Sequence, residues 1–290
     1  MICKFSIKDL EKLSGIKAHT LRIWEQRYGI LKPNRTDTNI RWYDNDELKN
    51  ILNVSLLNNH GYKISKIAEL SQEDIASEVT KIFESNIKES EQISSLIISM
   101  VEMDEQRFEK IISNQILRNG FSYTIEEVVY PFLHKIGIMW QTGSINPAQE
   151  HFITHLIRQK LIVAIDGQIV TENKMSKKFT LYLPENELHE LSLLYFTYLL
   201  KSKGHFVTYL GQSIPLIDVE RVVEIKNSDY VVSVFTHRMD SIQDYLNKLG
   251  ASFPQKKLLL SGYELTKQEI KLPDNAKLFK TPADFLSLLA

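Results

Sequence analysis

Residues 176–290 alternate short apolar runs with helical stretches, and this alternation limits the possible folds more than any other feature. Strands are predicted near Phe179–Leu183, His205–Leu210, Tyr230–Phe235, Lys257–Ser261 and Lys277–Phe279. Helical stretches lie between them, and the chain ends on one, Pro282–Leu289. Five strand–helix units of this kind predict a doubly wound, flavodoxin-like parallel five-stranded sheet.

His189 stands just past the carboxyl end of the first of these strands, after the polar turn Pro184–Leu188. Open parallel sheets bind ligands at this edge. One imidazole here could hold a metal cofactor or be an ordinary loop histidine, and its position alone favours the ordinary histidine. The sequence contains no GxGxxG or Walker pattern, so nothing in it supports a nucleotide site.

The middle of the chain has apolar residues at helical spacing and no strand-like pattern, which predicts a small helical bundle. Helices are expected over Glu73–Ser85, Glu89–Met100, Asp104–Asn119, Thr124–Met139 and Gln149–Ile165. His151 and His155 are one helical turn apart, a spacing that suits zinc, but no third ligand is near in sequence. Taken alone, Trp140 reads as a core anchor and Glu150 as an acid near a helix start.

Charge is distributed unevenly along the 290 residues. The whole chain has a net charge of −1, whereas residues 1–43 hold nine Lys/Arg and four acidic residues, a net +5. A basic end on a neutral chain predicts a polyanion bound by one module. The single cysteine, Cys3, excludes a disulfide framework and fits a reducing cytoplasm. No apolar run approaches the ~20 residues of a membrane span, and the charged N-terminal residues do not suit a signal peptide, so no membrane association is expected.

The basic end has the pattern of a helix-turn-helix. A short helix, Ile7–Leu13 with Ser6 as N-cap, is followed by Ser14-Gly15 and a second helix, Ala18–Tyr28. A polar, turn-rich loop, LKPNRTDTNIRWY, comes next and is typical of a wing beside a recognition helix. Leu21 and Trp24 are expected to face the core. The alternative is a solvated basic surface on a small helical domain.

The stretch TLRIWEQRYGILKPNRTDTNIRWYDNDEL resembles the winged helix-turn-helix of the MerR family of transcription regulators, over roughly residues 3–72. Helices at Asp44–Asn59 and Ile64–Leu70 complete that domain. The resemblance implies a homo-oligomer, at least a dimer, on a palindromic operator in double-stranded DNA. By matching positions, it implies DNA contacts from Lys17, His19, Thr20, Arg22, Tyr28, Arg35, Arg41 and Tyr43.

A second resemblance concerns the helical region. Trp140 is followed ten residues later by Glu150-His151, as in the helical cap of cobalamin-binding photoreceptor regulators of the CarH type. In that family these residues cover the upper face of the corrin, against the adenosyl group. Light-sensing relatives have, after the Trp, a His that captures cobalt after photolysis. This chain has Gln141 there, so that lock cannot form in the same way.

The stretch KGHFVTYLGQSIPLIDV resembles cobalamin domains of the methionine-synthase and mutase type. Their motif Asp-x-His-x-x-Gly corresponds to Glu187, His189 and Ser192. The resemblance implies that His189 is the lower axial cobalt ligand and that Glu187 accepts its imidazole N–H. Ser192 and Ser261 replace glycines and are departures that crowd the site. A slot for the nucleotide tail is expected at the small residues Gly211, Ser233 and Gly262.

Together these features predict a multidomain α and α/β protein. The expected domains are a winged helix-turn-helix at 1–75, a helical bundle of the cobalamin-cap type at 76–172 and a cobalamin-binding-type domain at 173–290. The leading hypothesis is a cytoplasmic repressor that senses adenosylcobalamin and, by resemblance, light, with the cofactor favouring a tetramer on DNA.

The sequence allows two other hypotheses. One is a regulator whose sensor region no longer uses cobalamin and serves oligomerisation or a protein partner. The other is a cobalamin enzyme, which the DNA-binding head and the lack of room for a substrate barrel argue against. We therefore predict no catalytic residues.

Overall fold

The computed structural model divides into two compact units, residues 1–156 and 157–290. The structure describes residues 4–36, 39–84, 89–141, 145–171, 174–239, 241–266 and 270–289, without the side chains of residues 76, 80–84, 89, 90, 138, 140 and 141. No helix in these ranges has both the length and the apolar character that crossing a bilayer demands. The bounds of the three expected domains stay predictions, and residues 172 and 173 lie outside the described ranges.

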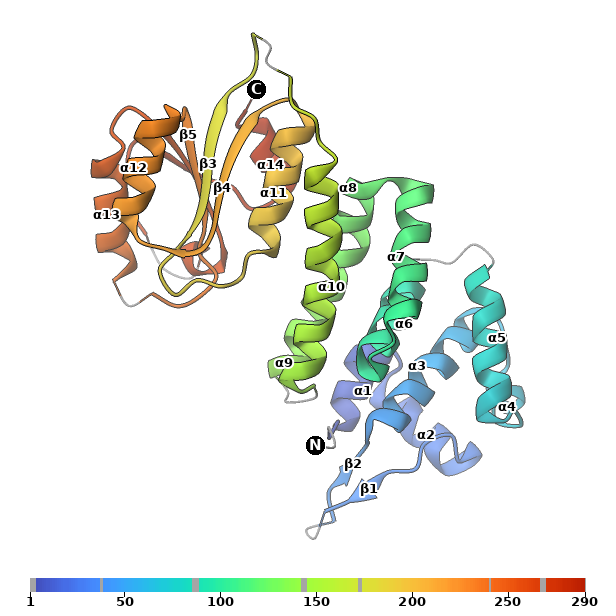
Figure 1. Cartoon of the computed structure of the whole chain (residues 1–290). Coiled ribbons are helices and arrows are strands. Elements are labelled where there is room, and N and C mark those ends of the chain that lie inside the picture. Colours follow the sequence, from blue (N-terminus) through green and yellow to red (C-terminus); the bar gives the residue numbers. More distant parts are fainter. Residues whose placement is uncertain are drawn as a thin grey trace. The chain divides into compact units, whose positions relative to one another are not determined.

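The first unit begins with the predicted helix-turn-helix (Figure 1). Its elements are α1 (Ile7–Ser14), α2 (Ala18–Tyr28), β1 (Asn34–Arg35), β2 (Arg41–Trp42), α3 (Asn45–Asn59) and α4 (Ile64–Ile67). Ser6 caps α1 in a reciprocal capping box with Asp9, and Gly15 ends that helix at φ 75°, a left-handed conformation that suits glycine. The N-cap prediction is confirmed. Helix α4 is shorter than the predicted Ile64–Leu70, because the chain turns after Ile67.

Helices make up the rest of this unit in the described residues. They are α5 (Gln72–Glu84), α6 (Glu89–Glu102), α7 (Glu105–Asn119), α8 (Phe121–Tyr123), the π-helix η1 (Thr124–Val129), α9 (Tyr130–Gln141) and the start of α10 (Pro147–Asp166). The prediction of one regular α-helix over 124–139 is wrong at its start, because residues 124–129 form a π-helix. Pro131 has no N–H to donate to the carbonyl four residues back, and its ring would clash with that carbonyl in a regular α-helix. The wider π-helical turn relieves the clash.

The second unit contains the predicted parallel sheet. Its strands are β3 (Lys178–Pro184), β4 (Phe206–Ile214), β5 (Tyr230–Val234), β6 (Lys257–Ser261) and β7 (Ala276–Leu278), in the order β4-β3-β5-β6-β7. All neighbours pair in parallel, which confirms the flavodoxin-like order. The chain moves from β3 to β4 on one side and then to β5 on the other. The strand order therefore reverses between β3 and β5, the place where such sheets bind ligands.

Helices cover both faces of this sheet (Figure 1). On one face lie α12 (Leu216–Lys226) and α13 (Ile242–Ser252), and on the other α11 (Leu191–Ser202) and α14 (Pro282–Ser287). The α12/α13 face packs a core that includes Tyr182, Val219 and Phe235. On the other face the rings of Phe196, Phe279 and Phe285 meet at 4.8–5.0 Å between centroids.

One prediction within the sheet is wrong. Leu210-Gly211 was expected to end a strand, but β4 continues to Ile214. Gly211 adopts φ 85° and the pairing with β3 shifts register there, so the backbone bulges and the strand goes on. This extension places the end of β4 beside the turn that carries His189.

Candidate functional sites

The turn after β3 holds an imidazole against a buried carboxylate. His189 Nδ1 lies 2.6 Å from Glu187 Oε1, and the main-chain N–H of His189 donates to the same oxygen at 3.0 Å. The His189 side chain is 65% exposed, whereas that of Glu187 is 3% exposed. A carboxylate on Nδ1 fixes the orientation of the ring, so Nε2 is the nitrogen that could ligate a metal. Metal-ligating histidines commonly have such a carboxylate partner.

Glu187 also bridges the two strands at the reversal point. Its Oε2 accepts the main-chain N–H groups of Thr236 at 2.6 Å and His237 at 2.5 Å, just after β5. Burial raises the pKa of Glu187, but the hydrogen bonds from His189, His237 and Thr236 outweigh it and hold the pKa at about 2. The carboxylate is therefore ionised and fixed at neutral pH, and it presents the His189 ring at the switch point.

The extended end of β4 supports the same turn from the other side. Gln212 Nε2 donates to the Leu188 carbonyl at 2.6 Å. Ser213 donates its N–H to the Glu187 carbonyl at 3.2 Å, and its hydroxyl accepts the Asn186 N–H at 3.1 Å. The turn is thus attached to both neighbouring strands, which limits its movement.

Glu190, the residue after His189, makes a separate network. Its Oε1 lies 2.5 Å from Arg158 Nε on α10, and its Oε2 accepts the Tyr209 hydroxyl at 2.5 Å. Glu190 is buried. Burial and the nearby carboxylate raise the pKa of Tyr209, so its hydroxyl stays a donor.

The predicted tail-slot residues surround the end of the central strands. Tyr182 pairs with Gly211 on β4 and with Ser233 on β5. The Ser233 hydroxyl is buried and interacts with the Tyr182 hydroxyl, so it places a polar atom within the predicted slot. Gly262 has φ 118°, and a Cβ there would lie 2.2 Å from the Phe235 carbonyl oxygen. The chain's own packing thus requires this glycine.

The two departures from the family motif lie at the same edge of the sheet. Ser192 is the second residue of α11 and is half-buried, and Ser261 ends β6. Neither closes off the exposed ring of His189. With an imidazole fixed by Glu187 at the switch point, and small residues on the neighbouring strands β4 and β5, the residues present fit a cobalamin.

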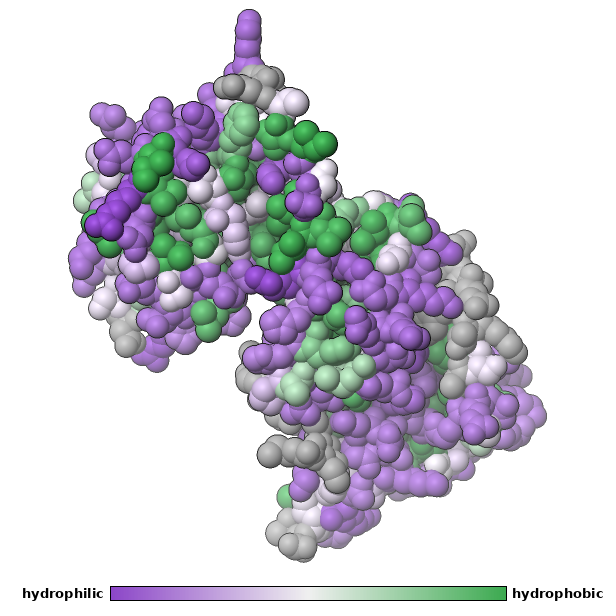
Figure 2. Space-filling model, in the orientation of Figure 1, coloured by the Kyte–Doolittle hydropathy of each residue, from purple (hydrophilic) through white to green (hydrophobic). Residues whose placement is uncertain are grey.

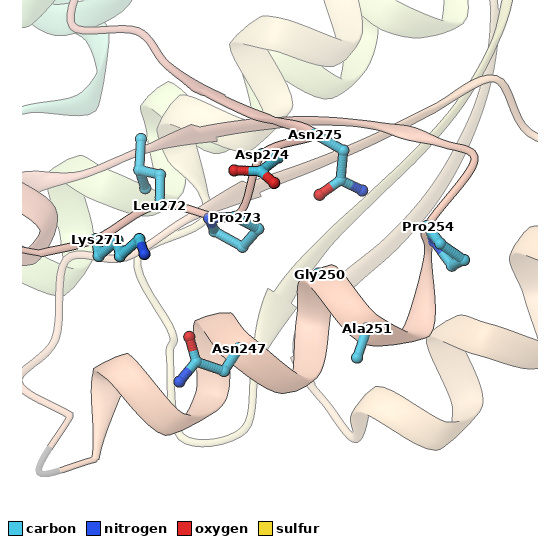
Figure 3. A pocket seen from close by; sticks show the side chains of 9 residues that line it. All are labelled: Asn247, Gly250, Ala251, Pro254, Lys271, Leu272, Pro273, Asp274 and Asn275. Carbon is cyan, nitrogen blue, oxygen red and sulfur yellow. The ribbon is translucent and has the colours of Figure 1, made fainter.

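A separate surface cavity, with a volume of about 430 Å³, lies elsewhere in this unit (Figure 3). It is lined by Asn247, Gly250, Ala251, Pro254 and residues 271–275. Pro254 precedes β6 and Asn275 precedes β7, so the cavity lies at the amino ends of the strands. His189 follows the carboxyl end of β3, and the cavity is therefore not part of its site.

The cap residues are only partly described. Trp140 and Gln141 are the last two residues of α9, but their side chains lie outside the described part. Glu150 and His151 lie in the first turns of α10, where Glu150 Oε2 is 3.6 Å from His151 Nε2 and His151 is 65% exposed. The His151 and His155 rings are 6.2 Å apart, and the described residues contain no cluster of three or more metal-binding side chains.

The recognition helix presents polar side chains to solvent. Lys17, His19 and Arg22 are exposed, and Thr20 and Tyr28 are half-buried. Leu21 and Trp24 are buried, as predicted. The visible face of this head is mainly hydrophilic, whereas apolar atoms show over α11 and α12 in the second unit (Figure 2). The surface therefore suits contacts with phosphates and base edges.

The wing is attached to the recognition helix by Glu25. Glu25 Oε1 lies 3.2 Å from Arg41 Nε, and its Oε2 accepts the Tyr43 hydroxyl at 3.0 Å. Arg35 is exposed at the wing and donates to Asn39. Tyr43 is fully buried, and burial followed by the Glu25 charge raises its pKa. The predicted DNA contact of Tyr43 is corrected: its ring packs inside the head and positions the wing.

Comparison with known proteins identifies two regions of the chain. Residues 5–74 match the model of the MerR HTH family regulatory protein, and residues 92–164 match that of the B12 binding domain. The chain thus joins a segment that matches the MerR model to a segment that matches the B12-binding model. The sequence resemblances to a MerR head and a cobalamin-binding region are thereby confirmed.

Similarity to individual proteins covers more of the chain than the two family models do. The HTH-type transcriptional repressor CarH of Myxococcus xanthus is 26% identical over 259 residues, 87% of this chain and 86% of that protein. The repressor CarA of the same organism is 26% identical over 213 residues, 72% of this chain and 68% of that protein. The monomethylamine corrinoid protein of Methanosarcina barkeri has a TM-score of 0.55 at 14% identity, over 69% of this chain and 98% of that protein. The last likeness concerns the fold.

Several residues of the His189 site have no signature in the sequence. Thr236 and His237 act through main-chain N–H groups, which any residue could supply, and Arg158 is distant along the chain. Only the polar pair Gln212-Ser213 after Gly211 carries a local signal, because it interrupts an otherwise apolar strand.

Proposed function

We propose that this chain is a transcriptional repressor that binds double-stranded DNA through its MerR-type head and senses adenosylcobalamin through the region that follows. The observation that carries the sensing role is the Glu187–His189 pair, an exposed imidazole held at the switch point of a flavodoxin-like sheet. Both curated relatives reported above are transcriptional repressors, so the chain is a regulator rather than an enzyme.

Bound cobalamin would supply a cobalt centre that accepts an imidazole ligand. His189 Nε2 would ligate the cobalt, while Glu187 holds Nδ1. The buried Ser233 hydroxyl would meet a polar atom of the nucleotide tail. Gly211 and Gly262 shape the backbone around it, and Ser192 adds a hydroxyl at the start of α11. We retain Trp140, Glu150 and His151 as proposed cofactor contacts on the basis of their resemblance to the cap residues.

On DNA, the exposed Lys17, His19 and Arg22 would lie in the major groove, with Thr20 and Tyr28 at its margin. Arg35 and Arg41 would bind phosphates from the wing. We propose that the protein acts in the cytoplasm and binds a palindromic operator as a homo-oligomer. The cofactor would determine whether that oligomer is a dimer or a tetramer.

The decisive experiment adds adenosylcobalamin to the whole protein in the dark and follows the corrin absorbance through gel filtration. A corrin spectrum that elutes with the protein is expected, and a colourless protein peak would contradict the proposed sensing. His189→Ala should shift the spectrum to a form without imidazole. His205→Gln is the matched control, since it removes an imidazole at the amino edge of the same sheet.

The same samples test the remaining parts of the proposal. Sedimentation with and without cofactor gives the oligomer, and green light tests the light response. A protein that binds DNA as an oligomer but never retains corrin would support the alternative of a cobalamin-independent sensor region.

A further inference from the structure

Glu190 is a buried carboxylate directly beside the proposed cobalt ligand. It lies between His189 and the first residue of α11, and its side chain is 8% exposed. Burying a charge is costly unless it is paired and hydrogen-bonded. The chain satisfies this one with two charge-assisted contacts, one to each carboxylate oxygen, from Arg158 and Tyr209.

The two partners come from different elements. Arg158 lies on α10 and is 44% exposed on its side chain, whereas Tyr209 lies on β4 before the Gly211 bulge. The main chain of Glu190 is also held, since its N–H donates to the Leu188 carbonyl and its carbonyl accepts the Leu194 N–H. Glu190 is therefore fixed at both its backbone and its carboxylate, and the adjoining His189 backbone is fixed with it.

Glu187 and Glu190 thus hold the histidine at two places along the chain. Glu187 contacts the ring at Nδ1 and the main-chain N–H of His189. Glu190 fixes the main chain one residue later, at the start of α11. The backbone of His189 is therefore held on both sides, and this second attachment adds to the Nδ1 contact in setting where Nε2 points.

We propose that Arg158, Glu190 and Tyr209 are positioning residues that set the direction of the His189 ring for metal ligation, and that α10 acts on the ligand through Arg158. This inference rests on the proposed function for its ligand. It predicts that loss of either partner weakens ligation by an amount that the change in folding stability does not account for.

The test compares Arg158→Ala, Arg158→Lys and Tyr209→Phe in the whole protein. Glu185→Gln is the matched control, because Glu185 is an exposed acid in the same turn. The first readout uses NMR of protein labelled at histidine, without cofactor. His189 ring signals should move in Arg158→Ala and Tyr209→Phe, return towards wild type in Arg158→Lys, and stay in place in Glu185→Gln.

The second readout is the corrin spectrum with adenosylcobalamin. Arg158→Ala and Tyr209→Phe should lower the affinity about tenfold and enrich the form without imidazole, as for other partners of metal ligands. Unmoved His189 ring signals in both variants would overturn the positioning role, whatever the corrin result. If the wild-type protein retains no corrin, the proposed function fails. The NMR result still decides whether Arg158, Glu190 and Tyr209 position the His189 ring.

Discussion

Glu25 in the DNA-binding head and Glu187 in the sheet unit both hold a functional side chain, but with different partners. Glu25 contacts two side chains, the Arg41 guanidinium and the Tyr43 hydroxyl. Glu187 contacts one imidazole nitrogen and otherwise three main-chain N–H groups. One carboxylate is thus held by side chains, of which Arg41 is partly exposed, and the other mainly by main-chain groups.

The Arg41–Glu25 contact can therefore be exchanged for another partner, whereas the main-chain contacts of Glu187 are permanent. The Arg41 side chain is 38% exposed and can leave Glu25 for a DNA phosphate without disturbing the backbone. The main-chain partners of Glu187 cannot rotate away, so the position of its carboxylate is set before any ligand arrives. A cation that binds DNA benefits from the first arrangement, and a metal ligand benefits from the second.

The largest expected effect is on stability. Glu187→Ala should lower the free energy of opening β3 by about 3 kcal/mol, because it removes a buried carboxylate that accepts three main-chain N–H groups and one imidazole nitrogen. Glu25→Ala should lower the unfolding free energy of its unit by only about 1 kcal/mol. All three tryptophans lie in residues 1–156, so their emission in urea reports Glu25, while hydrogen exchange of β3 reports Glu187. Equal losses would remove the distinction, and Glu185→Ala serves as control.

Acid should reveal the same carboxylate. The folded state lowers the pKa of Glu187 from 4.5 to about 2, so its stabilisation is complete above pH 4.5 and is lost as the pH falls towards 2. Between pH 5 and pH 3 this group should remove about 2 kcal/mol from the opening free energy of β3. The measurement is hydrogen exchange of wild type against Glu187→Gln. Parallel pH profiles for the two proteins would disprove the assignment.

In the head, Arg41→Ala should weaken DNA binding about tenfold and reduce the slope of log K against log salt by about one. The probe is a duplex selected from a random pool by the wild-type protein, measured at several salt concentrations. Lys226→Ala removes one positive charge from α12 and should leave both values unchanged. An unaltered slope for Arg41→Ala would show that this wing residue does not bind phosphate.

The smallest effect is expected at Tyr43. Tyr43→Phe keeps the buried ring and removes only its hydrogen bond to Glu25, which should cost about 1 kcal/mol of unfolding free energy. DNA affinity should stay within about twofold, because the ring does not face the DNA. Tryptophan emission in urea and the same duplex provide the two measurements. A loss as large as that of Arg41→Ala would restore Tyr43 as a DNA contact.

Local patterns in the sequence were sufficient for most of the fold. The strand–helix alternation predicted the parallel sheet, and Ser6, Gly15 and the basic second helix predicted the helix-turn-helix, because each depends on neighbouring residues. The burial of Tyr43 was missed, since it depends on Glu25 and on pairing with Phe5 far along the chain.

The part of the candidate site that lies within one turn was predictable from the sequence. The contacts that join residues of different helices and strands were not. Glu187 and His189 are two residues apart and carry a motif. The attachment of Glu190 to Arg158 joins residues 32 positions apart. The strand was predicted to end at Leu210, because a glycine that bulges a strand looks the same in sequence as one that ends it.

That bulge also affects how the protein behaves at high concentration. In the described sheet β4 is an edge strand, with a neighbour on one side only. A long, regular edge is a template on which another chain can add a strand and start aggregation. Gly211 at φ 85° and Ser213 at φ 54° break the regular spacing of the open edge. The same distortion that brings β4 to the histidine turn therefore protects the molecule from self-association through this strand.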